Sequence, residues 1–327
     1  MATSYPDRTN ARGIWNVNQN SKNLLNEGTF PQGSTRGIFN IGNSVAVTVE
    51  YITLEVLGNS ADFGDLSDGR NQNASVGNFT RSIFAGGATP SLTDIIDYAS
   101  ILTLGNYADF GDLSAGKRVL GSSGNTTRGV FGGGKTPTVL NVLEYITIAS
   151  TGDVVDFGDL TQTGTGWQNS QCNSPTRGLF AASDTPAFTD VINFIHLSTT
   201  GNAVDFGDLT FAHVQSAGIC SSVKGIWAGG TDTGGSSIEI DSVTIGSLGN
   251  ATDFGDLTAA SQHPGGMSSQ KRGVFSGINP GGAVLDYITI ASAGDSTDFG
   301  DCTACRQGSG NSNGHGGLDV YDPTTRV

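Results

Sequence analysis

The sequence has few basic side chains, few cysteines and histidines, and no long apolar run. Its 16 lysines and arginines stand against 30 acidic residues in a chain of 327, which gives a formal charge of −14. Phosphate backbones and anionic membranes repel such a chain, so we expect neither nucleic acid nor a membrane surface as a partner. No stretch approaches the ~18 apolar residues of a membrane span, and the polar N-terminal stretch has no apolar signal region. We therefore expect no membrane insertion and no secretory signal.

Cysteine and histidine are too scarce to define a site. The cysteines are Cys172, Cys220, Cys302 and Cys305. Four are too few for a disulfide scaffold at this length. The Cys302-x-x-Cys305 spacing fits half of a zinc site, but a second pair is missing, so buried free thiols are preferred over a zinc or redox role. The histidines, at unrelated repeat positions that suggest no metal cluster, are His196, His213, His263 and His315.

No set of residues typical of an enzyme can be assembled from the sequence. Gly129 to Thr136 fits the phosphate-binding pattern G-x-x-x-x-G-K-[ST]. A proline and a strand pattern follow where that mechanism requires a helix, so we interpret the match as coincidence. The sialidase box is absent, and neither a Ser-His-Asp arrangement nor a copper-oxidase constellation can be argued. We predict a protein that is not an enzyme and needs no cofactor.

What the sequence does contain is one unit repeated six times. DFGDL, or DFGDC in the last copy, begins at residues 62, 109, 156, 205, 253 and 298, so the copies advance by 45 to 49 residues. Four residues before each copy stands a glycine followed by Asn or Asp, as in Gly58-Asn59. Upstream come an alternating segment, such as EYITI from Glu144, and a segment such as RGVF from Arg128. A catalytic aspartate is needed once, so a DFG motif present six times indicates structure.

Each segment of the unit predicts one structural element. The β-branched, alternating EYITI predicts a strand with two unlike faces. The Gly-Asn pair predicts a two-residue hairpin loop, and DFGDL predicts the return strand. RGVF predicts a short buried strand, and the stretch before it has room for a fourth, while no segment has a convincing helical period. Four short strands in about 47 residues are typical of a propeller blade.

We therefore predict an all-β protein, a β-propeller of four-stranded kelch-like blades. Six blades are preferred and seven are the alternative; a β-solenoid is disfavoured because its coils are usually shorter and lack antiparallel hairpins. Residues 1–35 are predicted to be an N-terminal arm or linker, and residues 36–327 the propeller. Arg12 to Trp15 resembles a seventh repeat start. The tail from Gly314 could supply an inner strand that completes the blade begun near Arg36.

The aspartates and phenylalanines of the motif are the candidate structural residues. We expect the phenylalanines to form the core between blades, and the aspartates to satisfy local turns or to pair with the arginines of the repeat. A calcium site using Asp62 and Asp65 is a less favoured alternative, because two carboxylates supply too few of the six to eight oxygens. The motif residues are Asp62, Phe63, Asp109, Phe110, Asp156, Phe157, Asp205, Phe206, Asp253, Phe254, Asp298 and Phe299.

The least uniform segments are the loops after the RGVF-like strands. All of them should emerge on one face of the ring, where they could serve recognition or could simply have drifted in sequence. They are Ala88 to Thr93, Lys135 to Thr138, Ser183 to Phe188, Thr231 to Ser237 and Asn279 to Gly282.

The repeat resembles two known groups of proteins. Its strand order and double glycines, such as Gly132-Gly133, resemble kelch repeats. A closer resemblance is to the tandem DFGDLT repeats of virion proteins from marine tailed phages, especially those infecting cyanobacteria. The block from Arg128 to Thr161 carries almost the full pattern, and Ser312 to Leu318 looks like the end of such arrays. The segment from Gly13 to Pro31 resembles a short GVW…WP element near the starts of these arrays, with Phe30 in place of the usual Trp.

This resemblance implies a non-enzymatic virion structural protein, part of a tail, fibre or capsid appendage. It implies neighbouring virion proteins as partners, a symmetric assembly, a location in the virion after assembly in the host cytoplasm, and attachment to a host-surface glycan or protein. The arm would dock on a neighbour through Trp15, Phe30 and Pro31. The alternatives are a cellular kelch-like adaptor and, less favoured, a carbohydrate-active propeller enzyme.

Overall fold

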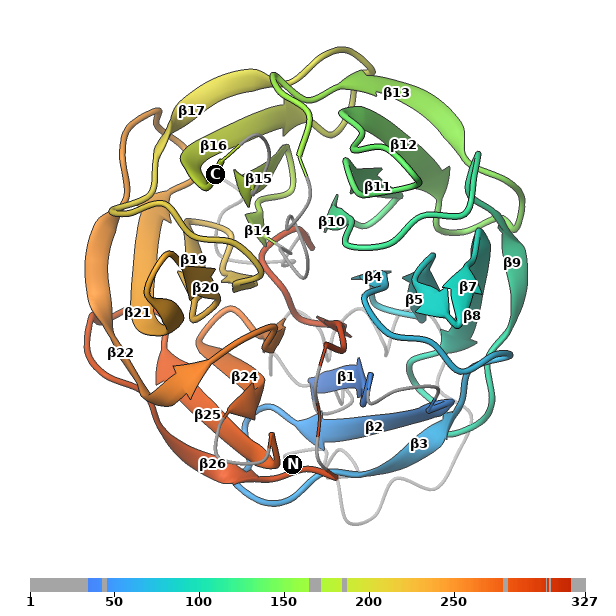
Figure 1. Ribbon diagram of the computed structural model, residues 1–327. Coiled ribbons are helices and arrows are strands. Elements are labelled where there is room, and N and C mark those ends of the chain that lie inside the picture. Colours follow the sequence, from blue (N-terminus) through green and yellow to red (C-terminus); the bar gives the residue numbers. More distant parts are fainter. Residues whose placement is uncertain are drawn as a thin grey trace, which may run out of the picture. The chain divides into compact units, whose positions relative to one another are not determined.

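Six repeats fold into six blades. The computed structural model describes residues 35–318 except 43–45, 165–171, 184–186, 279–281, 304 and 306. These residues belong to one compact unit, Thr35–Asp319. Within them the chain forms six four-stranded antiparallel blades around a central axis and no helix (Figure 1). The predicted all-β propeller with six blades is confirmed, and the seven-bladed and solenoid alternatives are wrong.

Each blade is numbered by its RGVF-like strand, and its strands are given from the axis outwards. Blade 1 contains β27 (Gly310–Ser312), β1 (Arg36–Asn40), β2 (Thr48–Thr53) and β3 (Ala61–Asp65). Blade 2 contains β4 (Ala74–Gly77), β5 (Arg81–Ala85), β8 (Ile95–Ser100) and β9 (Ala108–Asp112). Blade 3 contains β10 (Gly121–Gly124), β11 (Arg128–Gly132), β12 (Val142–Thr147) and β13 (Val155–Asp159).

The remaining blades follow the same order. Blade 4 contains β14 (Cys172–Asn173), β15 (Arg177–Ser183), β16 (Thr189–His196) and β17 (Val204–Asp208). Blade 5 contains β18 (Ala217–Cys220), β19 (Lys224–Ala228), β21 (Gly235–Thr244) and β22 (Thr252–Ser261). Blade 6 contains β23 (Gly265–Ser268), β24 (Arg272–Ile278), β25 (Val284–Thr289) and β26 (Thr297–Asp301). Short extra strands in the loops of blades 2 and 5 are β6 (Ala88–Thr89), β7 (Ser91–Leu92) and β20 (Thr231–Asp232).

Burial explains the composition of each strand. The second strand of a blade is covered on both faces by its neighbours, so β1 is buried from Gly37 to Asn40. The outer strand exposes its first two residues and buries the phenylalanine, as in β3. The inner strands crowd around the axis and are fully buried with small side chains, as in β10, which reads GSSG. The predicted fourth strand between DFGD and the next basic residue is this inner strand.

The strand order gives the ring two unlike faces. One face carries the short turns between the first and second strands and the connections between the third and fourth strands; we call it the turn face. The opposite face carries the connections between the second and third strands and the connections to the next blade; we call it the loop face. The predicted variable loops of blades 2, 3 and 5, which the structure describes, belong to the loop face because every blade has the same strand order.

The last described strand closes the ring. β27 pairs antiparallel with β1, with Gly37 opposite Ser312, so the C-terminal part of the chain completes the first blade. The predicted closure is therefore correct in kind. The strand, however, is Gly310–Ser312 and not the tail from Gly314, because that tail turns away across the axis.

Six buried polar side chains tie the inner strands to one another. Each donates a hydrogen bond of 2.5–2.9 Å to the inner strand of the preceding blade. The donor–acceptor pairs are Ser75 Oγ to Gly310 O, Ser122 Oγ to Ser75 O, Asn173 Nδ2 to Gly124 O, Cys220 Sγ to Asn173 Oδ1, Ser268 Oγ to Cys220 O and Ser312 Oγ to Ser268 O. These bonds form a closed circle around the axis, and Gly, Ser, Cys and Asn are the residue types that fit it.

The residues after β27 cross the axis at the turn face. His315 is 1% exposed; its Nε2 lies 2.8 Å from Gly77 O and its Nδ1 accepts from the Gly317 N–H at 3.2 Å. The carbonyl oxygen of His315 accepts a hydrogen bond from Gln270 Nε2 at 3.0 Å. A Cβ at Gly316 or Gly317 would collide with backbone of blades 5 and 3. The segment thus contacts several inner strands at once, which explains the glycines of its GHGGL sequence.

We expect His315 to make the folded state less stable in acid. Burial lowers its pKa to about 4 in the folded state, whereas an unfolded chain binds the proton near its usual pKa of about 6.5. The unfolded state therefore holds more protons between these values, and stability present above pH 6.5 is lost as the pH falls to 4. His315→Gln should flatten the curve of unfolding free energy against pH by up to about 3 kcal/mol, measured by urea denaturation.

The comparison with a control variant isolates this residue. Burial also lowers the pKa of His213 and of His263, so both variants keep the contribution of these two residues to the pH dependence. His196→Gln, at an exposed position, should leave the curve parallel to that of the unaltered protein. Equal pH dependence in His315→Gln and the unaltered protein would show that the crossing segment does not exclude the proton.

Candidate functional site

The six motif phenylalanines lie at the junctions between blades. Each is 2–3% exposed and packs in a hydrophobic cluster drawn from two neighbouring blades. Phe63 packs with Ile38 and Val49 of blade 1 and with Phe84 and Ile101 of blade 2. The others, each at the next junction around the ring, are Phe110, Phe157, Phe206, Phe254 and Phe299. The motif therefore buries its aromatic side chain where one blade meets the next.

Three hydrogen bonds join the outer strand of each blade to the next blade. Between blades 6 and 1, the Gly58 N–H donates to Phe299 O and the Ser60 N–H donates to Asp301 O, both at 2.9 Å. The Asp301 N–H donates in return to Asn59 Oδ1 at 3.1 Å. The same three bonds recur at the other five junctions. We call this arrangement the clasp.

The clasp corrects the predicted role of the Gly-Asn pair. The connection from β2 to β3 spans residues 54–60, so Gly58 and Asn59 do not form a two-residue hairpin turn. Both face the neighbouring blade, and both clasp glycines have positive φ, +151° at Gly58 and +148° at Gly300. A Cβ on Gly300 would lie 2.5 Å from Gly58 O, whereas a Cβ on Gly58 would meet nothing within 4 Å. The glycine of DFGD is thus required by a contact between two backbones.

The aspartates of the motif do not pair with the arginines of the repeat. The first aspartates are exposed on the outer strands; they are Asp62, Asp109, Asp156, Asp205, Asp253 and Asp298. In two copies the carboxylate accepts from the glycine two residues later, at Gly255 N and Gly300 N, which is the predicted local role. The second aspartates contribute their backbone to the clasp. The predicted ion pairs with arginine are wrong, because the arginines have other partners.

Each basic residue of the RGVF-like strands lies on an aromatic ring and reaches the next blade. The Arg36 guanidinium carbon lies 5.2 Å from the centre of the Tyr51 ring, and Nη1 donates to Ile101 O at 3.0 Å. The same arrangement holds at Arg81, Arg128, Arg177 and Arg272. Arginine suits this position because its planar group stacks while its edge donates.

The acid before the aromatic residue of the third strand binds a hydroxyl from the preceding blade. In blade 6, both Asp286 oxygens accept from Thr258, whose N–H and Oγ1 lie 2.7–2.9 Å away. Equivalent hydroxyl contacts from the Ser or Thr that follows DFGDL are made to Asp97, Glu144, Asn193 and Asp241. Glu50 accepts from the backbone N–H of Thr303, which follows DFGDC. The sequence carries a signal for this contact, since a Ser or Thr follows every copy of the motif, but no role was predicted for that residue.

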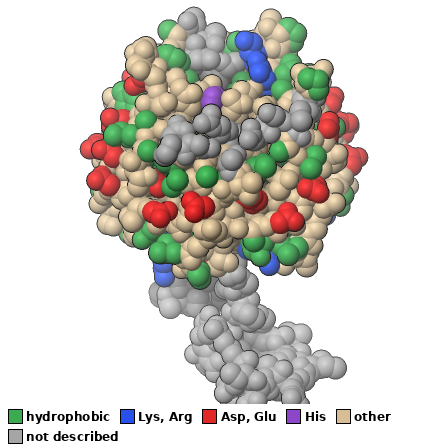
Figure 2. Space-filling model, turned by 60° about the horizontal axis from the view of Figure 1, so that its bottom comes forward, with side chains coloured by type: hydrophobic (Ala, Val, Ile, Leu, Met, Phe, Trp, Pro, Cys, Tyr) green, Lys and Arg blue, Asp and Glu red, His purple; other side chains and the backbone are tan. Residues whose placement is uncertain are grey.

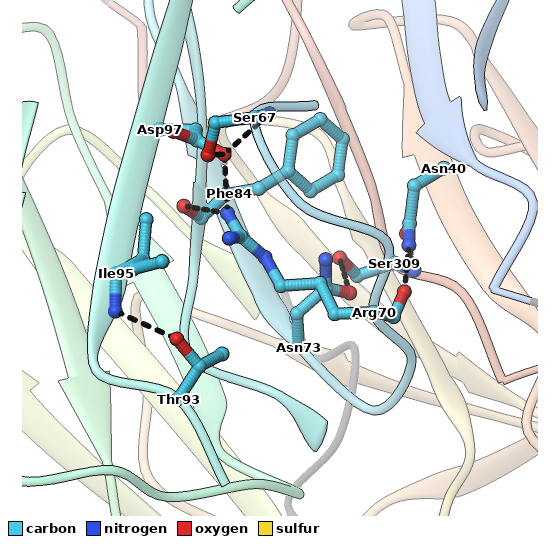
Figure 3. Close-up of polar contacts among 9 residues, drawn as sticks. All are labelled: Asn40, Ser67, Arg70, Asn73, Phe84, Thr93, Ile95, Asp97 and Ser309. Carbon is cyan, nitrogen blue, oxygen red and sulfur yellow. Dashed lines mark hydrogen bonds and ion pairs between the residues drawn. The ribbon is translucent and has the colours of Figure 1, made fainter. Parts of the chain in front are cut away.

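Two of these acids also form buried ion pairs. Arg70 Nη2 lies 2.9 Å from Asp97 Oδ2, with both side chains 0% exposed, and Lys117 Nζ lies 2.7 Å from Glu144 Oε2. Figure 3 shows that Asp97 accepts hydrogen bonds from both Ser67 and Arg70. Arg70 Nη2 also donates to Phe84 O at 3.3 Å. Burial lowers the pKa of Arg70, and the charge and hydrogen bond of Asp97 oppose that change.

The backbone beside this pair reaches the closing segment. Asn40 of blade 1 donates to Arg70 O at 3.2 Å and accepts from the Ser309 N–H at 2.7 Å (Figure 3). Ser309 Oγ donates to Asn73 Oδ1 at 3.0 Å. The ion pair of blade 2 is therefore continuous with the hydrogen bonds that hold the last strand in place.

In blades 2, 3 and 4 the residue eight positions after the first motif aspartate matches the charge of the acid of the third strand. Arg70 and Lys117 stand at this position where the acid is Asp97 or Glu144. In blade 4 the position holds Gly164 and the acid is replaced by the neutral Asn193. In blade 5 it holds His213, whose charge lowers the pKa of Asp241, although burial is the larger effect and raises it. These blades thus change both partners together. In blade 6 the position holds the neutral Ser261, and the buried Asp286 accepts hydrogen bonds from Thr258 and Ser296.

The cysteines are free thiols buried at two places. Burial raises the pKa of Cys220 to about 11 and that of Cys172 as well. A hydrogen bond from Cys305 lowers the pKa of Cys302, which replaces the leucine of DFGDL. Among the described residues no group of three or more His, Cys, Asp and Glu side chains could hold a metal ion. The zinc and calcium alternatives thus receive no ligand set in this part of the chain.

Two other sequence features can be placed or set aside. Residues 133–141, which include the end of the phosphate-loop pattern, form a loop and not the helix that phosphate binding would need. The predicted docking residues Trp15, Phe30 and Pro31 lie outside the described residues, as does the possible repeat start at Arg12.

Charge is distributed unevenly over the described surface. Figure 2 shows acidic side chains gathered around the rim, where the outer strands lie, with basic side chains confined to small groups. The loops of blades 2, 3 and 5 are tied to the connections beneath them through Asn71 with Ala88, Arg118 with Lys135 and Val214 with Thr231. The described part of the chain contains no helix long and apolar enough to span a bilayer.

Comparison with known proteins adds no name to this architecture. No protein-family model matches the chain, and no curated protein matches it either. Assignment of function therefore depends on the repeat, its junctions and the surfaces that they leave free.

Gly300→Ala should destabilise the ring more than Gly58→Ala at the same junction. Both changes place a side chain at positive φ, which costs about 1–3 kcal/mol, but only Gly300→Ala also forces a methyl group onto Gly58 O. We expect a further loss of about 1–3 kcal/mol, measured as the difference in urea unfolding free energy. Equal losses would show that backbone conformation alone selects the glycine of DFGD.

Asp97→Asn should destabilise the protein by about 3–5 kcal/mol, because it leaves the buried Arg70 guanidinium without its counter-charge. The double variant Arg70→Met, Asp97→Asn reproduces the neutral state of blade 4 and should recover part of that loss. Urea denaturation of both variants and of Arg70→Met completes the cycle. Additive losses from the two single changes would contradict the coupling of the two positions.

Proposed function

We propose that the chain is a non-enzymatic structural protein of a phage virion, carried on a tail, fibre or capsid appendage. It acts there in assembly and in attachment to the host surface. The observation that supports this proposal is that the recurring residues of the repeat make the contacts between neighbouring blades. A ring constructed in this way is a rigid support, and the same repeat pattern is the one that resembles phage virion proteins.

The two faces divide this work. Thr35 and Leu318, the ends of the described chain, both lie at the turn face, where Arg36 N donates to Asn313 Oδ1 at 2.8 Å. We infer that the turn face is the one directed towards neighbouring virion proteins in a symmetric assembly. The variable loops at the opposite face and sites on the rim are available to a host-surface glycan or protein. The acidic rim favours neither nucleic acid nor an anionic membrane.

Mass spectrometry of purified phage particles tests the proposal. Particles from an infection that expresses this chain, banded by density, should contain it at a constant ratio to the major capsid protein. Immunogold electron microscopy should then place it on a tail, fibre or capsid appendage. A non-structural protein of the same infection serves as the control for carry-over. Recovery of the chain only in the particle-free fraction would exclude the virion role.

A further inference from the structure

Blade 5 departs from the repeat at two positions that touch in the other blades. Five blades stack an arginine on an aromatic ring of the third strand; the rings are Tyr51, Tyr98, Tyr145, Phe194 and Tyr287. In blade 5 the basic residue is Lys224 and the residue in place of the ring is Ser242. Because the third strand of blade 5 supplies no ring, the Lys224 ammonium lies instead 5.4 Å from the centre of the Phe254 ring, on the outer strand.

A cavity of about 260 Å³ lies beside Ser242, where the other blades have the ring. The strands that contribute to it, β19, β21 and β22, form the outer three strands of blade 5 (Figure 1). Ser242 lies at its buried part, and Thr244 and Leu248 beside it are exposed, so the cavity is accessible from solvent. The lining residues are Lys224, Ser242, Val243, Thr244, Ser247, Leu248, Gly249, Asn250 and Thr252. Pockets that bind drug-sized ligands have volumes of roughly 300–1,000 Å³. This cavity is smaller, so its volume suits a single ring with its substituents.

The lining is rich in hydroxyl groups and has one cation. Four side chains carry hydroxyls, Asn250 carries an amide, and Leu248 supplies apolar surface. Lys224 Nζ has only a long contact of 3.5 Å to Ala291 O, and no carboxylate of the described residues lies within ion-pair distance of it. Arginine at the equivalent positions makes bonds of 2.7–3.0 Å to the next blade. Lys224 is therefore the least engaged of the six basic residues.

We propose that this cavity binds one acidic monosaccharide unit. Its ring occupies the place of the missing aromatic ring, its hydroxyls bond to the Ser, Thr and Asn side chains, and its carboxylate lies on Lys224. The polar lining favours a sugar over an aromatic ring, and the ammonium favours an acidic sugar over a neutral one. A long polyanion is disfavoured by the net charge of −14. That the sugar belongs to a host surface rests on the proposed virion function.

Binding of defined monosaccharides to the full chain tests the site. The probes are the methyl glycosides of glucuronic acid and N-acetylneuraminic acid, with methyl glucoside as the neutral counterpart, titrated to about 10 mM by NMR. We expect at least one acidic glycoside to bind, and to bind about tenfold or more tightly than the neutral one. Absence of binding by both acidic probes, or equal binding of the neutral one, overturns the proposal.

Three variants assign the binding to blade 5. Ser242→Tyr restores the residue type of the repeat, fills the cavity and should abolish binding without lowering the melting temperature. Lys224→Gln should remove the preference for the acidic sugar. Lys271→Gln, which changes the net charge equally at an exposed turn of blade 6, should change neither. Binding that survives in Ser242→Tyr places the site elsewhere and overturns the proposal.

The site can also be transferred. Arg272→Lys with Tyr287→Ser gives blade 6 the two departures of blade 5, and should create a second site or raise the amount of acidic glycoside bound at saturation. No gain in a folded double variant would show that the two departures do not define the site. Detection in virions is a separate measurement, so a chain found in virions that binds no acidic sugar would refute this inference and leave the proposed function standing.

Discussion

The close contact of two glycine-containing backbones at each junction is the constraint on which the ring depends. At the junction of blades 6 and 1, Gly58 donates to Phe299 O, and Gly300 has no room for a Cβ beside Gly58 O. Three hydrogen bonds fix the spacing and angle of neighbouring outer strands, and the same three recur six times. Because hydrogen bonds are directional and a glycine contact has a fixed distance, identical junctions repeat an identical rotation and the ring closes.

The clasp fixes the spacing of neighbouring blades at their outer strands, and the inner strands must pack at the spacing that follows from it. Six strands meeting at one axis leave room only for small side chains, and the circle of bonds from Ser75, Asn173 and their counterparts joins each inner strand to the next. Charge is held between these two layers, where Arg70 and Lys117 are buried against Asp97 and Glu144. A buried ion pair contributes little to stability by itself, yet removing one partner is costly, so such pairs persist or disappear together.

The architecture could be predicted from the sequence because it depends on spacing. Four strands in each unit of 45 to 49 residues, repeated six times, give six blades, and a Phe in every copy indicates packing between them. The clasp could not be predicted, since Gly58 and Asn59 fit a hairpin turn equally well and their partner Phe299 lies at the other end of the repeat array. The stacking of Arg36 on Tyr51 was missed because it follows from strand register, with Arg36 opposite Thr53 and Tyr51 diagonal to it.

Six copies in one chain form an internal comparison, and paired departures from the repeat separate two kinds of change. Gly164 with Asn193 removes a cation and an anion together, so blade 4 keeps its electrostatic balance and no new surface arises. Lys224 with Ser242 keeps the cation and removes the ring that covered it, which leaves a cavity and a poorly engaged ammonium. A ring that had only to fold would gain nothing from the second change, because the stacked pair of the other five blades is the better packing. That departure is the observation from which we infer the binding site of blade 5.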